Sequence, residues 1–286
     1  MSEVGIFINF HYANSLEFSD FRLLASDLRN SQAKFYSGLL KDRGDFVRWS
    51  AITHRGRVRS NNEDALCVRQ ELGLFAVADG LGGHQAGEVA SRAAVQVLAG
   101  EVEAHPGAKD ACGLLGAAVE AANRRVYELS QADATCTGMG TTLSACLVRE
   151  GWLSVAHVGD SRVYLLRGNT IRQLTEDHSL VQELVRQGKI SSEDAAEHPY
   201  RNVVSRALGT SARVQPDLIR LPLAPGDRVF LCTDGLSNQV RDEEILAMAG
   251  GLPPDEAVSR LLALALTRGG PDNITMVLVV IDEDDW

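Results

Sequence analysis

Residues 141–166 read TTLSACLVREGWLSVAHVGDSRVYLL, and this stretch decides the fold class. It holds three strand-like runs that are rich in apolar and β-branched residues: Thr141–Arg149, Trp152–Val158 and Val163–Leu166. The turn-type pair Glu150–Gly151 separates the first two runs, and Gly168–Asn169 follows the third. Short apolar runs joined by turn residues are typical of antiparallel strands. We therefore predict an antiparallel meander here.

Around this stretch, short apolar runs alternate with helical stripes. Further strands are predicted at Ala65–Arg69, Leu74–Ala78, Arg228–Thr233 and Asn273–Ile281, the last almost continuously apolar and therefore central. The 3.6-residue period predicts helices at Glu88–Val102, 111–129, Ser179–Gly188, Ser191–Ala196 and Asp255–Thr267. Hairpins interrupted by paired helices indicate an α+β fold. We expect a central sandwich of two antiparallel β-sheets flanked by α-helices, in four αββα layers.

The first 46 residues differ in composition from the rest. They hold much of the aromatic content, and Phe21, Leu24, Leu28 and Phe35 have roughly the spacing of one short amphipathic helix. We expect residues 1–46 to be an N-terminal extension of unknown role, either a packing or poorly ordered extension or a docking or regulatory segment. Residues 47–283 are expected to form a single catalytic domain.

Composition excludes several classes of protein. The net charge of −10 argues against a surface for nucleic acid or an anionic membrane. Five cysteines without C-x-x-C spacing argue against a zinc site or a disulfide framework, and indicate a reducing compartment. No apolar run reaches about 18 residues, the length of a membrane span. We expect a cytoplasmic protein.

Five aspartates stand at the ends of predicted buried strands: Asp64, Asp79, Asp160, Asp234 and Asp272. Any one of them could belong to an ordinary turn, but carboxylates that converge repel one another unless a cation neutralises them. Oxygen ligands without cysteine or histidine favour Mg²⁺, Mn²⁺ or Ca²⁺. Several carboxylates suggest two ions, which could activate a shared water for in-line attack on a phosphate. Four residues before Glu63, Arg59 has the planar guanidinium that suits a phosphate.

The chain resembles the metal-dependent serine/threonine phosphatases of the protein phosphatase 2C type, in their bacterial form. The resemblance covers about residues 48–281 and rests on six segments in family order: Arg59-Ser60-Asn61-Asn62-Glu63-Asp64, Val77-Ala78-Asp79-Gly80-Leu81-Gly82-Gly83-His84, Gly140-Thr141-Thr142, Val158-Gly159-Asp160-Ser161-Arg162, Cys232-Thr233-Asp234-Gly235-Leu236 and Gly270-Pro271-Asp272-Asn273-Ile274-Thr275.

This resemblance implies a role for each matching residue. Asp79 would bridge two catalytic Mn²⁺ or Mg²⁺ ions, and the Gly80 carbonyl would ligate one of them. Asp234 and Asp272 would hold the other ion. The remaining implied roles are metal contacts through water for Glu63 and Asp64, phosphate binding for Arg59, a third, weaker metal site for Asp160 with Asp234, and a flap beside the active site for residues 171–214.

The resemblance also implies a substrate class and partners: phosphoproteins, and a serine/threonine kinase that the phosphatase opposes in signalling. The implied reaction is hydrolysis of phosphomonoesters by a metal-bridged water or hydroxide. Leu81 occupies the position at which many eukaryotic members have a histidine. His84 is the nearest candidate general acid, and a structural role is its alternative. Two other functions remain open, a phosphohydrolase with a non-protein substrate and an inactive binding module on the same fold.

Overall fold

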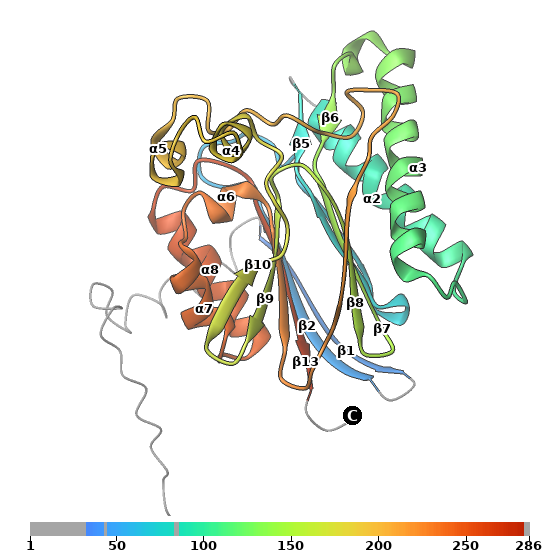
Figure 1. The fold of residues 1–286 in the computed structure, drawn as a ribbon, viewed down its shortest axis with the longest axis vertical. Helices are drawn as coiled ribbons and strands as arrows, with labels where there is room; N and C mark the ends of the chain where they lie inside the picture. Colours follow the sequence, from blue (N-terminus) through green and yellow to red (C-terminus); the bar gives the residue numbers. More distant parts are fainter. Residues whose placement is uncertain (1–32, 43–44, 83–85, 283–286) are drawn as a thin grey trace, which may run out of the picture.

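A computed structural model describes residues 33–42, 45–82 and 86–282. Two antiparallel sheets face each other at the centre of the molecule (Figure 1). Going across the first sheet, its six strands are β1 (Lys34–Asp42), β2 (Asp45–His54), β13 (Ile274–Ile281), β12 (Arg228–Cys232), β9 (Arg162–Arg167) and β10 (Thr170–Gln173). In the same way, the five strands of the second are β11 (Asp217–Pro222), β8 (Trp152–Val158), β7 (Leu143–Arg149), β4 (Leu74–Ala78) and β3 (Ala65–Arg69). A short third ladder joins β5 (Gly80–Leu81) to β6 (Gly140–Thr141).

Helices cover both outer faces of the sandwich (Figure 1). The second sheet is covered by α2 (Ala86–Ala104) and α3 (Ala111–Ala132). The first sheet is covered by α6 (Asp234–Ser237), α7 (Asp242–Ala249) and α8 (Pro254–Thr267), while α4 (Leu180–Arg186) and α5 (Ser192–Glu197) lie at one end of the sandwich. The predicted αββα architecture is confirmed.

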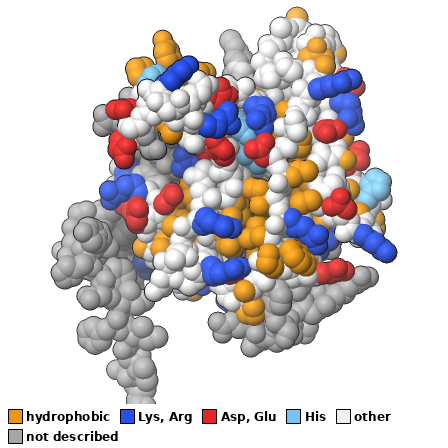
Figure 2. All heavy atoms as spheres, viewed as in Figure 1, with side chains coloured by type: hydrophobic (Ala, Val, Ile, Leu, Met, Phe, Trp, Pro, Cys, Tyr) orange, Lys and Arg blue, Asp and Glu red, His pale blue; other side chains and the backbone are white. Residues whose placement is uncertain are grey.

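Apolar side chains fill the three spaces between these four layers. The space between the sheets contains Trp49, Phe75 and Val277, and Trp49 and Phe75 have ring centroids 6.3 Å apart. On the face shown in Figure 2, hydrophobic side chains gather over the middle of the molecule and charged side chains gather above them. Among the described residues, no helix is long and apolar enough to cross a membrane.

The final strand, β13, is central, as its continuous apolar sequence predicts. It pairs with β2 on one side and β12 on the other, and all eight of its residues are buried. Helix α8 packs over the same sheet with Leu261, Leu262 and Ala265 fully buried. Because β13 has a strand on each side and is packed on both faces, its sequence does not alternate between polar and apolar residues.

The predicted meander is correct for two strands and wrong for the third. Strands β7 and β8 pair as a hairpin, but β9 crosses to the other sheet and pairs with β10 and β12. The free edge of β8 is occupied by β11, so β9 cannot add there. The chain turns across at Gly159, whose φ of 114° favours glycine and whose added Cβ would lie 2.5 Å from the Thr142 side chain.

The first 46 residues contribute to the sheet. Residues 34–42 form the edge strand β1, which pairs with β2 over its whole length, and β2 itself begins at Asp45. The amphipathic helix expected around Phe21 lies outside the described residues except at Phe35, where the prediction is wrong: Phe35 is in β1 and pairs with Ile52. The division between an extension at 1–46 and a catalytic domain at 47–283 stays a prediction, although the sheet includes strand residues from both parts.

Leu278→Ala should destabilise the fold by about 2–5 kcal/mol, because Leu278 is fully buried in the central strand and truncation would leave a cavity. Leu218→Ala is the matched control, since that leucine is 46% exposed on the edge strand β11 and should cost well under about 1 kcal/mol. Urea unfolding followed by circular dichroism measures both. Equal losses would contradict the central position of β13.

Candidate active site

Antiparallel pairing brings the five aspartates to one edge of the sandwich, the one at which these strands begin or end. Asp64 directly precedes β3 and Asp79 follows β4, and their neighbours Ala65 and Ala78 are register partners. Asp234 follows β12, and Asp272 lies two residues before β13. Strands β12 and β13 are antiparallel neighbours, so the two aspartates come to the same edge. Asp160 lies between β8 and β9, and β9 begins opposite the end of β12. The convergence expected from the sequence is therefore present.

Burial and mutual repulsion make these carboxylates difficult to ionise together. Burial is the main cause that raises the pKa of Asp79 well above its ordinary value, and the charges of Asp64 and Asp234 raise it further. The pKa values of Asp64 and Asp160 are both raised to about 7, again first by burial and then by the nearby Asp234. Burial also raises the pKa of Asp234, with Asp272 as the next cause. A cation would relieve both effects.

Two buried carboxylate oxygens at this edge have no hydrogen-bond partner among the residues that the structure describes. They are Oδ1 of Asp64 and Oδ1 of Asp234. The other oxygens are bound: Asp64 Oδ2 accepts from the Thr233 hydroxyl at 2.9 Å, and Asp234 Oδ2 accepts from the Asn238 amide at 3.1 Å. A buried polar atom without a partner is rare in proteins and calls for an explanation such as an ion. Oxygen donors of this kind suit a hard divalent cation.

The side chains are gathered but not closed around one point. In the described part of the chain, no group of three or more His, Cys, Asp and Glu side chains could hold a metal ion as it stands. Asp272 is engaged on both oxygens: Oδ2 accepts from Arg59 Nη2 at 2.8 Å, and Oδ1 accepts from the main-chain N–H of Asn273 at 2.8 Å. The carboxylate oxygens suit a divalent cation. To bind one, Asp272 would have to exchange its bond from Arg59 for the ion.

Arg59 and Glu63 come to the same edge from the loop between β2 and β3. The Arg59 side chain is 55% exposed, so its guanidinium is accessible to a ligand while it contacts Asp272. Burial raises the pKa of Glu63, and the nearby Arg59 lowers it. His84 lies outside the described residues, so its predicted acid role stays a prediction.

Gly80 allows a close backbone approach beside Asp79. A Cβ at this position would lie 2.2 Å from the carbonyl oxygen of Gly87 and 2.6 Å from that of Glu63. These contacts admit only glycine, since real Cβ atoms do not come so close to backbone. The backbone at Gly80 therefore packs directly against α2 and against the loop before β3.

Asn273 holds the Arg59 loop in place, and the sequence analysis assigned it no role. Its side chain donates to the carbonyls of Arg55 and Asn61 at 2.9 and 2.8 Å and accepts from the Glu63 N–H at 2.7 Å. All three bonds span more than 200 residues of sequence. Only the position of Asn273 directly after Asp272 could have indicated this role.

A second set of polar side chains binds the backbone of Asp79, and the sequence analysis did not identify this set either. The Asp79 N–H donates to the Thr142 hydroxyl at 2.8 Å, and that hydroxyl lies 2.8 Å from the Ser161 hydroxyl. The Ser144 hydroxyl lies 3.0 Å from the Ser161 carbonyl and 2.9 Å from His157 Nδ1. Buried polar chains of this kind fix side chains in one arrangement.

Two stacked histidines connect this set to the residues after β10. The rings of His157 and His178 are 4.7 Å apart between centroids. Because His178 Nδ1 accepts from the Gly159 N–H at 3.0 Å, its Nε2–H is the donor to Asp217 at 3.2 Å. Asp217 also accepts from Arg206 at 2.6 Å. The turn that carries Asp160 is therefore tied to both ends of the predicted flap.

The comparisons with known proteins agree with this geometry. Residues 53–266 match the family model described as protein phosphatase 2C. The chain is 44% identical over 239 residues to the serine/threonine protein phosphatase PstP of Mycobacterium tuberculosis, covering 83% of this chain and 46% of PstP. It is 41% identical over 239 residues to the serine/threonine phosphatase stp of Listeria monocytogenes, covering 80% of this chain and 94% of stp. The chain thus spans less than half the length of the mycobacterial relative.

Solved structures show the same similarity. A crystal structure of the M. tuberculosis phosphatase PstP superposes with a TM-score of 0.78 at 42% identity, covering 83% of this chain and 99% of that one. The PstP catalytic domain in complex with two manganese ions gives a TM-score of 0.76 at 41% identity, with the same coverage.

The buried histidine His157 should make stability depend on pH. Burial lowers its pKa to about 4 from the ordinary 6.5, so between these values the unfolded chain binds the proton more strongly. Its contribution is complete above about pH 6.5 and decreases by up to about 3 kcal/mol as the pH falls toward 4. His157→Gln keeps hydrogen-bonding groups toward Ser144 and the Glu176 carbonyl without titrating, and should flatten this slope. The exposed His105→Gln is the control, and an unchanged slope in His157→Gln urea titrations would refute the assignment.

Proposed function

The chain belongs to the protein phosphatase 2C family, and from this premise we propose that it is a serine/threonine protein phosphatase that hydrolyses phosphomonoesters of phosphoproteins. The observation that carries the proposal is the convergence of five aspartates at one edge of the sandwich, where two buried carboxylate oxygens have no partner within the described part of the chain. An inactive binding module has no need for carboxylates that repel one another in the same place.

The proposed cofactors are two Mn²⁺ or Mg²⁺ ions at this edge. Asp79, the Gly80 carbonyl, Asp234 and Asp272 would hold the two ions, with Asp79 serving both, and Glu63 and Asp64 would lie around them. A relative, the PstP catalytic domain, has a structure in complex with two manganese ions. When bound, such ions act as Lewis acids and lower the pKa of water toward neutrality. Asp160, together with Asp234, is proposed to hold a third and weaker ion.

The residues of the chain would do the remaining work of orientation. Arg59 would bind the phosphate through the accessible part of its guanidinium, while its bond to Asp272 keeps it directed toward the carboxylates. Asn273 would hold the loop that carries Arg59 and Glu63. Thr142 would fix the backbone of Asp79 through the 2.8 Å bond from the Asp79 N–H. His84 is proposed as the general acid that protonates the leaving oxygen.

The proposed partners are phosphorylated proteins and an opposing serine/threonine kinase. A cytoplasmic location is part of the proposal, because all five cysteines are free thiols, and this suits a reducing compartment. A small phosphorylated metabolite is the alternative substrate, since the metal ions and Arg59 would bind the phosphate group and not its carrier. Comparing phosphopeptide with metabolite turnover separates the two.

Metal removal tests the proposed function directly. Phosphopeptide hydrolysis should vanish in excess chelator and return with Mn²⁺. Asp79→Asn and Asp234→Asn should each weaken Mn²⁺ binding in calorimetry and lower turnover by at least about a hundredfold. In chelator, Asp79→Asn should melt at a higher temperature than the parent, because one repelling carboxylate is gone. Asp255→Asn, exposed at the start of α8, is the control, and full activity in chelator would sink the proposal.

Arg59→Ala should raise KM for a phosphopeptide by about ten- to a hundredfold, since a charge-assisted contact to phosphate is lost. Arg59→Lys should restore the affinity in part, because lysine lacks the planar fork. Mn²⁺ binding should not weaken, since the alanine variant loses a positive charge beside Asp272. Arg57→Ala, an exposed arginine two residues away, is the control. An unchanged KM in Arg59→Ala would show that Arg59 does not touch the substrate.

A further inference from the structure

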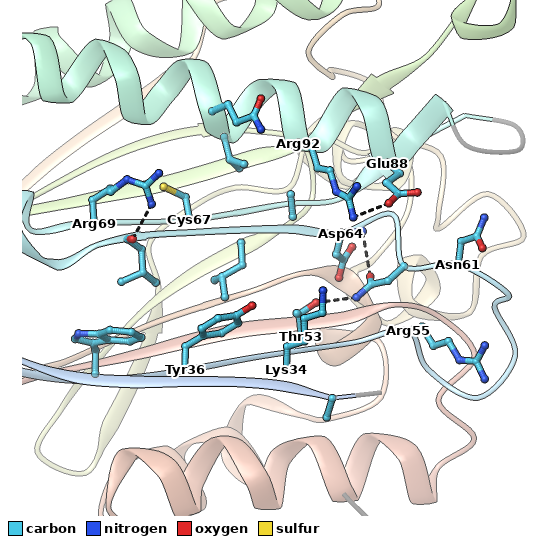
Figure 3. Close-up of a pocket in the computed structure, with 18 of the residues that line it drawn as sticks. Lys34, Tyr36, Thr53, Arg55, Asn61, Asp64, Cys67, Arg69, Glu88 and Arg92 are labelled. Carbon is cyan, nitrogen blue, oxygen red and sulfur yellow. Dashed lines mark hydrogen bonds and ion pairs between the residues drawn. The ribbon is translucent and has the colours of Figure 1, made fainter. Parts of the chain in front are cut away.

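A groove of about 1080 Å³ runs between the two sheets on the side of β1 and β3. Figure 3 shows it with α2 on one side and β1 on the other: Arg69, Asp64, Glu88 and Arg92 line the first side, and Lys34 and Tyr36 line the second. One end is at the active-site edge, where Asp64 is part of the wall.

Both walls of the groove end in strands with an open edge. In the described part of the chain, β3 is the last strand of the five-stranded sheet and β1 the last of the six-stranded sheet. Such edges present backbone N–H and C=O groups to which an extended peptide can add. Tyr36, 46% exposed on β1, adds an aromatic surface beside the opening. The shape suits an extended chain better than a compact molecule.

The charges along the groove favour an acidic occupant. Within the described residues, Lys34, Arg55 and Arg69 line it and form no ion pair with a carboxylate, whereas Arg92 is paired with Glu88 at 2.6 Å. The other acidic lining residues are Glu71, exposed beside Arg69, and Asp64, which is buried where the groove meets the active-site edge. Arg55 and Arg69 donate to the main-chain carbonyls of Ser60 and Val68, so within the described residues all three cations lack a carboxylate partner, in a chain with a net charge of −10.

The groove continues into the loop that carries the proposed phosphate contact. Ser60, Asn61 and Asn62 follow Arg59 directly and all line the groove. The Asn62 amide donates to the Thr53 hydroxyl at 2.8 Å, which ties this loop to β2 at the groove floor. A peptide whose phosphate reached Arg59 would therefore have the groove open to its neighbouring residues. The wall formed by β1 lies outside residues 53–266, the part that matches the family model.

We propose that this groove binds an extended, acidic segment adjoining the phosphorylated residue of the substrate protein. The inference rests on the proposed phosphatase function and names a feature of its substrate class. Lys34, Arg55 and Arg69 would contact the acidic side chains, and the open edge of β3 would pair with the peptide backbone. Selection would come from residues that do not take part in the reaction.

Peptide binding by the full chain, independent of turnover, tests the proposal. The probes are a fluorescein-labelled peptide with aspartates beside an unphosphorylated threonine, and a matched peptide with asparagines in their place. Fluorescence anisotropy should show that the acidic peptide binds about three- to tenfold more tightly at low salt, with the preference reduced by added salt. Arg69→Glu and Lys34→Glu should abolish the preference and favour a lysine-containing peptide instead. Arg172→Glu, the same change on the opposite edge strand β10, should leave the preference intact.

Equal binding of both peptides by the parent protein would overturn the proposal, as would an unchanged preference in both groove variants. Sedimentation velocity tests whether a second copy of the chain occupies the groove instead. Self-association that Arg69→Glu abolishes would overturn the proposal in favour of that second copy. A parent protein that binds the acidic peptide but hydrolyses no phosphopeptide would refute the phosphatase function while supporting acidic-peptide recognition by the groove.

Discussion

Electrostatic repulsion among five carboxylates gathered at one edge of the sandwich is the constraint on which the rest of this structure depends. Antiparallel pairing fixes the strand ends at one edge, and the aspartates that follow or precede them cannot move apart without breaking the ladders. The raised pKa values of Asp79 and Asp160 reflect the free-energy cost of holding these charges in partly buried, neighbouring positions. The apolar packing between the four layers must therefore be stable enough to hold this unfavourable arrangement, which a cation or a bound proton relieves.

Support for the site comes from residues with no charge to contribute. Asn273 joins β13 to the loop before β3, and Thr142 and Ser161 join β4 to the turn between the sheets. These contacts belong to different sheets, so the carboxylate edge is fixed from both halves of the sandwich. The pair His157 and His178 extends the same support toward the predicted flap.

The sequence was sufficient for the elements whose pattern is local. Strands β3 and β4 have the predicted bounds, and α8 begins one residue earlier than predicted, because apolar runs and helical stripes depend on nearby residues only. The position of β9 was not predictable in this way, since it depends on β11 occupying the edge of β8 from about 60 residues further along. The aspartates could be found because each stands at a strand end. Asn273 and Thr142 could not, because their partners lie far away in sequence and their side chains resemble ordinary turn and strand residues.

The central place of β13 also has a consequence for how the protein is made. Synthesis proceeds from the N-terminus, so β13 emerges from the ribosome after every other described strand, yet β2 and β12 both pair with it. Until then the six-stranded sheet is divided into two unconnected parts, and Asp272 and Asn273 are missing from the carboxylate edge. The half built on α2, α3 and the five-stranded sheet can assemble earlier, because its strands all precede residue 223. In the nascent chain the carboxylate cluster would thus stay incomplete until residues 272–281 have emerged and β13 has joined β2 to β12.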